Sequence, residues 1–112
     1  MSIHPSSVVD PAARLGAGVR IGPFCVIGPD VTLADGVEVK SHAVVTGWTD
    51  VGADTVIFPH ATVGEVPQDL KYAGERTRLI VGARCRIREG ATLNTGTAGG
   101  GGVTRVGDDC LL

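Results

Sequence analysis

Histidine is the side chain of this chain best suited to general-base chemistry near neutral pH, and the sequence contains three of them. His42 and His60 occupy equivalent positions of the repeat described below, whereas His4 falls at a different position. Two imidazoles could abstract a proton from a hydroxyl group, and three that converge could hold zinc. The position of His4 argues against zinc, and we expect His42 and His60 to stack at a surface corner.

The three cysteines offer less chemistry. Cys25, Cys85 and Cys110 show no Cys-x-x-Cys spacing. Each occupies a position of the repeat that should point inward. We therefore expect small buried hydrophobic side chains rather than metal or redox chemistry.

A basic run surrounds Cys85 on alternate residues. Arg84, Arg86 and Arg88 should all face outward, because alternate side chains of a strand share a face. We expect a solvated or intersubunit surface, with docking of an acidic carrier protein as the alternative.

The elements that position these side chains follow from a period of six. A branched aliphatic residue stands at every sixth position eleven times in succession, at Ile3, Val9, Leu15, Ile21, Ile27, Leu33, Val39, Val45, Val51, Ile57 and Val63. Helix faces recur about every 3.6 residues, so this period excludes a helix. It fits a short strand followed by a two-residue corner.

Each repeat of six can be placed in space. A small or β-branched residue stands two positions before each aliphatic, so both point inward from a strand. Dipeptides such as Asp35-Gly36 and Pro59-His60 fall at the corners, where proline, glycine and Asx residues favour turns. Three such repeats close one triangular coil. The sequence thus predicts an all-β fold, a hexapeptide-repeat solenoid that forms a single domain over residues 1–112.

Composition agrees with a narrow aliphatic interior, since 43% of residues are hydrophobic but only 4% are aromatic. The net charge of −2 argues against nucleic acid as a general partner. No segment approaches the roughly 18 apolar residues of a membrane span. Ile3 already belongs to the repeat, so we expect no signal peptide and a cytoplasmic location.

Two interruptions break the repeat. Residues 65–79 lack the aliphatic series, which returns at Val81. If they formed a coil, Asp69 and Glu75 would point unpaired into the apolar interior, which is costly. We therefore predict a protruding loop, and a long loop in a minimal repeat is usually functional. The second interruption, a Gly-rich turn at 98–104, lacks the Gly-Lys-Ser/Thr ending of a phosphate-binding loop.

The first interruption makes the sequence recognisable. Its run Gln-Asp-Leu-Lys-Tyr-Ala-Gly-Glu at residues 68–75 resembles the protruding loop of the acyl-carrier-protein-dependent UDP-N-acetylglucosamine O-acyltransferases, the first enzymes of lipid A biosynthesis. Segments 21–25, 40–42 and 86–89 resemble the same family, and the resemblance covers essentially the whole chain. Hexapeptide repeats are shared by many acyl- and acetyltransferases, whereas this loop is specific.

The resemblance implies a left-handed parallel β-helix and a reaction. In that reaction a 3-hydroxyacyl group passes from acyl carrier protein to the 3-hydroxyl of UDP-N-acetylglucosamine, with a histidine as general base and backbone amides stabilising the oxyanion. The resemblance implies no cofactor or metal, and active sites between the subunits of a homotrimer. By position, Gln68, Asp69 and Lys71 would line that cleft. Lys71 would approach the phosphates, and Asp69 the sugar or the acyl hydroxyl.

Two features depart from the family pattern. Many members have a histidine where this chain has Asn94, whose amide can still bind a ligand by hydrogen bonds. The family's catalytic histidine lies in a coil beyond Leu112, and the later coils and the C-terminal helical domain are also absent. We therefore expect no catalytic residue within residues 1–112, and no activity from the chain alone.

Two other functions stay open. A different hexapeptide acyltransferase, acting on another nucleotide-linked amino sugar, would share the repeat, and competition with UDP-N-acetylglucosamine would distinguish it. A non-catalytic β-solenoid scaffold would explain the missing histidine. An ice-binding face is disfavoured, because the threonines share no outward column.

Overall fold

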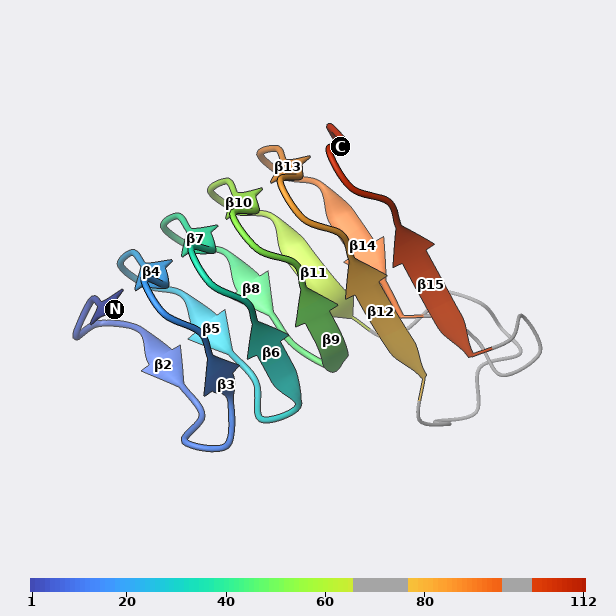
Figure 1. Cartoon of the computed structure of the whole chain (residues 1–112). Helices are drawn as coiled ribbons and strands as arrows, with labels where there is room; N and C mark the ends of the chain where they lie inside the picture. Colours follow the sequence, from blue (N-terminus) through green and yellow to red (C-terminus); the bar gives the residue numbers. More distant parts are fainter. Residues whose placement is uncertain (66–76, 96–101) are drawn as a thin grey trace.

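The computed structural model describes residues 1–65, 77–95 and 102–112. The chain winds into triangular coils that follow one another along a single axis, with short strands on their sides (Figure 1). In chain order the strands are β1 (Ser2–Ile3), β2 (Val8–Val9), β3 (Arg14–Leu15), β4 (Arg20–Ile21), β5 (Val26–Ile27), β6 (Val31–Leu33), β7 (Glu38–Val39), β8 (Val44–Val45), β9 (Trp48–Val51), β10 (Val56–Ile57), β11 (Thr62–Glu65), β12 (Arg78–Val81), β13 (Arg86–Ile87), β14 (Thr92–Asn94) and β15 (Val103–Val106).

The described strands form three parallel sheets of five strands each. Every third strand along the chain joins the same sheet, in the orders β1-β4-β7-β10-β13, β2-β5-β8-β11-β14 and β3-β6-β9-β12-β15. Ile21 pairs with Ile3 on one side and with Val39 on the other. One coil therefore takes 18 residues, the separation that also joins the side chains of Arg20 and Glu38. The predicted triangular solenoid is confirmed.

The aliphatic series fills the interior of the prism. Ile27, Leu33 and Ile57 are fully buried, whereas the outward Val26 remains 44% exposed. Cys25 and Cys85 are buried as predicted, and Cys110 is half-buried. Alternation along each strand therefore decides which side chains reach the core.

The corners have a recurrent backbone geometry. Their second residue adopts a left-handed conformation with φ between 56° and 64° at Phe24, His42, Asp54, His60, Arg84 and Asp109. Glycine takes the same place at Gly18 and Gly36. A turn with this conformation redirects the chain within two residues. The corner dipeptides predicted from the sequence are confirmed.

The register shows how the two interruptions join the prism. Val51 pairs with Val81, and the same separation of 30 residues joins Thr55 to Cys85, so the first interruption adds twelve positions to a coil. Val81 pairs with Val106, and the same separation of 25 residues joins Arg84 to Asp109, so the second adds seven. The first interruption is therefore an insertion between two strands rather than an extra coil, as the sequence predicts.

The strands extend further into both interruptions than the predicted ranges 65–79 and 98–104 suggest. Strand β11 includes Glu65, β12 begins at Arg78 and β15 begins at Val103. Both insertions leave the corner between the second and third sheets, because each joins a strand of one to a strand of the other.

Candidate functional site

The corner from which both insertions leave contains a cluster of hydrogen bonds. The backbone N–H of Thr95 donates to the carbonyl oxygen of Glu65 over 2.9 Å. Glu65 is the last residue before segment 66–76, and Thr95 is the last residue before segment 96–101. The starts of the two insertions are therefore held together by the backbone.

Two buried hydroxyl groups extend this contact. Thr77, the first described residue after segment 66–76, donates its hydroxyl to that of Thr95 over 2.9 Å. Thr95 in turn donates its hydroxyl to the carbonyl oxygen of Glu65 over 3.5 Å. The two threonines are only 5% and 6% exposed. Thr95 thus contacts both ends of the first insertion.

Glycine allows two backbones to approach closely at this corner. The pairing of β11 with β14 is irregular between Val63 and Glu65, and Gly64 there has a φ of 89°. A Cβ atom on Gly64 would collide with the carbonyl oxygen of Thr46 and the hydroxyl oxygen of Thr49. A larger residue at Gly64 would therefore displace the strand that leads into the first insertion.

Asn94 is the predicted site residue that falls within the described part of the chain. It ends β14 opposite Glu65, and its buried Oδ1 atom has no hydrogen-bond partner among the described residues. A buried amide oxygen left unpaired has a free energy cost, so such an atom calls for an explanation. One explanation is that the Oδ1 atom of Asn94 contacts a ligand. The other predicted residues, Gln68, Asp69 and Lys71, lie outside the described residues.

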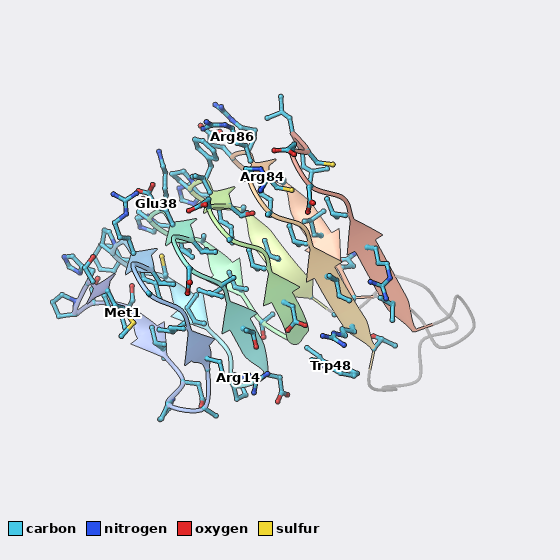
Figure 2. All side chains as sticks on the ribbon, in the orientation of Figure 1. Met1, Arg14, Glu38, Trp48, Arg84 and Arg86 are labelled. Carbon is cyan, nitrogen blue, oxygen red and sulfur yellow. The ribbon has the colours of Figure 1, made fainter. Side chains whose placement is uncertain are left out.

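A half-buried charge cluster flanks this corner on the third sheet. Arg78, the first residue of β12, forms an ion pair with Asp50 through its Nη2 atom. Its guanidinium carbon lies 4.9 Å from the ring centroid of Trp48, the first residue of β9 (Figure 2). Within residues 1–65, 77–95 and 102–112, the buried Nε atom of Arg78 has no hydrogen-bond partner. Sequence reasoning missed this cluster.

Thr77 and Thr95 were also missed, although a signal for them existed. They are 18 residues apart, which is one coil. The same spacing predicts the contact between His42 and His60. Threonine at a position that points into the prism is otherwise easily interpreted as a small β-branched core residue.

The basic run lies away from this corner, on the first sheet and its neighbouring turn (Figure 2). Arg84, Arg86 and Arg88 are all exposed, as predicted. Arg84 donates to Asp109 over 2.8 Å, and this hydrogen bond, helped by the charge of Arg84, lowers the pKa of Asp109. Arg88 lies 4.3 Å from the ring centroid of Phe58.

The predicted histidine column is confirmed. The rings of His42 and His60 stack with centroids 5.0 Å apart, and Phe24 continues the column 5.1 Å from His42. All three residues are exposed. His4 instead pairs its Nδ1 atom with the hydroxyl of Ser6 at 2.8 Å. The histidines thus converge on no common point.

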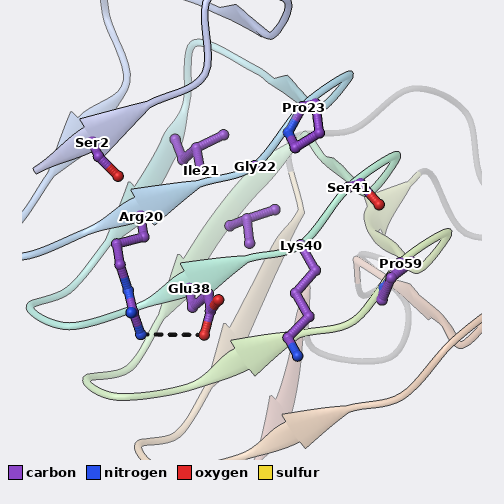
Figure 3. Close-up of a pocket in the computed structure, with 10 residues that line it drawn as sticks. Ser2, Arg20, Ile21, Gly22, Pro23, Glu38, Lys40, Ser41 and Pro59 are labelled. Carbon is purple, nitrogen blue, oxygen red and sulfur yellow. Dashed lines mark hydrogen bonds and ion pairs between the residues drawn. The ribbon is translucent and has the colours of Figure 1, made fainter.

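An open groove of about 460 Å³ lies on the outer face of the first sheet (Figure 3). Arg20, Glu38 and Lys40 supply its charges. Arg20 pairs with Glu38 at 3.2 Å, and the ammonium group of Lys40 lies 4.6 Å from the ring centroid of Phe58. Since its cations already have partners, we assign this groove no ligand.

Across residues 1–65, 77–95 and 102–112, no three His, Cys, Asp or Glu side chains gather closely enough to hold a metal ion. The same residues contain no helix of the length and apolarity that crossing a membrane requires.

Comparison with known proteins agrees with the fold and its period. Residues 12–47 match the family described as bacterial transferase hexapeptide (six repeats). Relatives named acyl-[acyl-carrier-protein]–UDP-N-acetylglucosamine O-acyltransferase include one from Mesorhizobium japonicum, 54% identical over 96% of this chain and 39% of its own. Another, from Azorhizobium caulinodans, is 50% identical over 95% of this chain and 41% of its own.

Among solved structures, LpxA from Acinetobacter baumannii superposes with a TM-score of 0.95 at 45% identity, over 97% of this chain and 42% of its own. The repeat and the three parallel sheets thus define a left-handed hexapeptide-repeat β-helix protein, and that predicted fold is confirmed. Within this class the chain belongs to the acyl-[acyl-carrier-protein]–UDP-N-acetylglucosamine O-acyltransferase family. It spans about two fifths of the length of these relatives.

Proposed function

We propose that the chain is part of an enzyme that transfers a 3-hydroxyacyl group from acyl carrier protein to the 3-hydroxyl of UDP-N-acetylglucosamine. The observation that carries the proposal is the 54% identity, over 96% of the chain, with a relative named acyl-[acyl-carrier-protein]–UDP-N-acetylglucosamine O-acyltransferase. The insertion between β11 and β12 supports it, because this segment carries the family-specific residues 68–75.

In this proposal residues 1–112 supply substrate-binding groups rather than the general base. Asn94 offers its buried Oδ1 atom, which has no partner in the described part of the chain, to a hydroxyl or N–H group of the substrate. Gln68, Asp69 and Lys71 contribute from the first insertion, with Lys71 near the phosphates as a positive point charge. The histidine that acts as general base comes from the part of the family that this chain does not span, and no cofactor takes part.

The proposed assembly is a cytoplasmic homotrimer with its sites between subunits. An exposed apolar surface supports contact between copies. Val8 is 66% exposed and Val26 is 44% exposed, on neighbouring strands of the second sheet, and Phe24 at the adjoining corner is 60% exposed. Apolar groups arranged in this way gain free energy when a partner covers them.

The test is a hybrid that replaces the matched part of the Mesorhizobium japonicum relative with residues 1–112. We expect the purified hybrid to acylate UDP-N-acetylglucosamine with 3-hydroxyacyl carrier protein as donor, and to sediment as a trimer. The relative itself is the positive control. A correctly folded trimer without activity would overturn the proposal and favour the scaffold alternative. A preference for a different nucleotide-linked amino sugar in competition assays would favour the other acyltransferase.

A further inference from the structure

We propose that Thr77 and Thr95 form a positioning clasp for the substrate-binding corner, an inference that rests on the proposed function. Their hydroxyls, with the carbonyl oxygen of Glu65, make a chain of hydrogen bonds from Thr77 to Thr95 to Glu65. Glu65 and Thr77 are the described residues that bracket the first insertion. The clasp therefore sets the separation and direction of its two ends.

Burial makes this chain of hydrogen bonds specific. Both threonines are more than nine-tenths removed from solvent, so neither hydroxyl can exchange its protein partner for water without opening the corner. Thr95 takes part three times, as backbone donor to Glu65, as acceptor from Thr77 and as hydroxyl donor to Glu65. Losing the Thr95 hydroxyl leaves Thr77 with no acceptor in this cluster and removes the side-chain link to Glu65.

The clasp also adjoins the proposed ligand contact. Thr95 directly follows Asn94, whose buried Oδ1 atom has no hydrogen-bond partner among the residues that the structure describes. Asn94 and Glu65 are paired across β14 and β11. Fixing Thr95 against Glu65 and Thr77 therefore fixes the backbone that presents the Asn94 amide. Thr77 and Thr95 act through these neighbours, so they are positioning residues and not catalytic ones.

A matched control exists at another corner of the same prism. Thr55 is fully buried, and its hydroxyl donates to the carbonyl oxygen of Gly82 over 3.0 Å and accepts from the N–H of Cys85 over 3.2 Å. Thr55 lies between the third and first sheets, away from both insertions. The variant Thr55→Val removes a buried hydroxyl without touching the proposed clasp.

The experiment measures steady-state kinetics of the hybrid acyltransferase and of its Thr77→Val, Thr95→Val, Thr95→Ser and Thr55→Val variants. Valine keeps the shape of threonine but removes the hydroxyl. We expect Thr95→Val to raise KM for UDP-N-acetylglucosamine about fivefold or more with kcat changed less, since losing one buried hydrogen bond changes an affinity by roughly that factor. Thr95→Ser keeps the hydroxyl and should restore KM to within about twofold.

The double variant Thr77→Val/Thr95→Val should be no worse than Thr95→Val alone, because both substitutions break one link. Thr55→Val should lower the melting temperature but leave KM unchanged.

An unchanged KM in a folded Thr95→Val hybrid, or an equal rise of KM in Thr55→Val, would overturn the inference while leaving the proposed function intact. If Thr95→Val does not fold, Thr77→Val takes its place, with Thr95→Ser as the variant that keeps the hydroxyl. A raised KM in Thr77→Val supports the inference, and an unchanged KM overturns it. An inactive parent hybrid would instead reject the proposed function, and this inference with it.

Discussion

Arg78 and Asp50 form an ion pair that joins two successive coils, although 28 residues separate them in the sequence. Their side chains are 35% and 27% exposed, and the guanidinium of Arg78 also lies over Trp48. The pair links β12, the strand that follows the first insertion, to its neighbour β9 in the third sheet. The stability of this corner therefore depends in part on a shielded charge interaction.

We expect Asp50→Ala to lower the free energy of unfolding by about 1–3 kcal/mol, because the half-buried guanidinium of Arg78 would lose its acceptor. Glu38→Ala is the matched control, since its partner Arg20 is 64% exposed and such pairs contribute under about 1 kcal/mol. Urea denaturation of the hybrid acyltransferase measures both. Equal losses would contradict the prediction.

Gly64→Ala should be much more damaging than an alanine at an open corner. At Gly64 the new Cβ atom would collide with Thr46 and Thr49, and the φ of 89° is itself unfavourable for alanine. We expect a loss of about 3 kcal/mol or more. The control is Gly18→Ala, where φ is 70° but no other atom lies within 4 Å of the new Cβ atom. We expect this substitution to lower the free energy of unfolding by only about 1–2 kcal/mol. Thermal unfolding compares the two, and similar melting temperatures would refute the steric argument.

Asn94→Ala separates a ligand contact from a structural role. The buried Oδ1 atom makes no hydrogen bond within the described residues, so its removal should change the free energy of unfolding by less than about 1 kcal/mol. The affinity of the hybrid for UDP-N-acetylglucosamine should nevertheless fall about tenfold, as expected when a hydrogen bond to a ligand is lost. Calorimetric titration gives the affinity. A large loss of stability with unchanged affinity would show that Asn94 is structural.

Arg84→Gln should raise the pKa of Asp109 towards its ordinary value. In the folded protein the hydrogen bond from Arg84, together with its charge, lowers this pKa, while desolvation opposes the shift. A lowered folded-state pKa stabilises the protein above the ordinary pKa of the carboxyl group, and that contribution disappears as the pH falls through the folded-state pKa. NMR titration of the Asp109 carboxyl carbon measures the change. Arg86→Gln, on the neighbouring strand, should leave the pKa of Asp109 where it is.

The sequence contains most of the information for the fold. The aliphatic residue at every sixth position predicts both the inward face and the coil-to-coil register that pairs Ile21 with Val39. The turn dipeptides predict the corners. Asp69 and Glu75 would point unpaired into an apolar interior if residues 65–79 formed a coil, so the sequence argues against one. Periodicity succeeds here because each coil repeats the same local geometry.

Less of the candidate site could be predicted. The resemblance identifies Asn94, but only the structure reveals that its Oδ1 atom is buried and has no partner in the described ranges. The pair Arg78–Asp50 crosses the first insertion, where the spacing of contacting residues on successive coils lengthens from 18 residues to 30 residues. Periodicity cannot give such contacts, because the length of an insertion hides which residues face one another.

The placement of both insertions at one corner also has a consequence for how relatives differ in length. The other two corners keep two-residue turns in every described coil, and an added residue there would disrupt the tight turn that redirects the chain within two residues. Gains and losses of residues should therefore concentrate between Glu65 and Thr77 and between Thr95 and Gly102. Along this stretch of the family, one edge of the prism can diversify while the other two stay fixed in length.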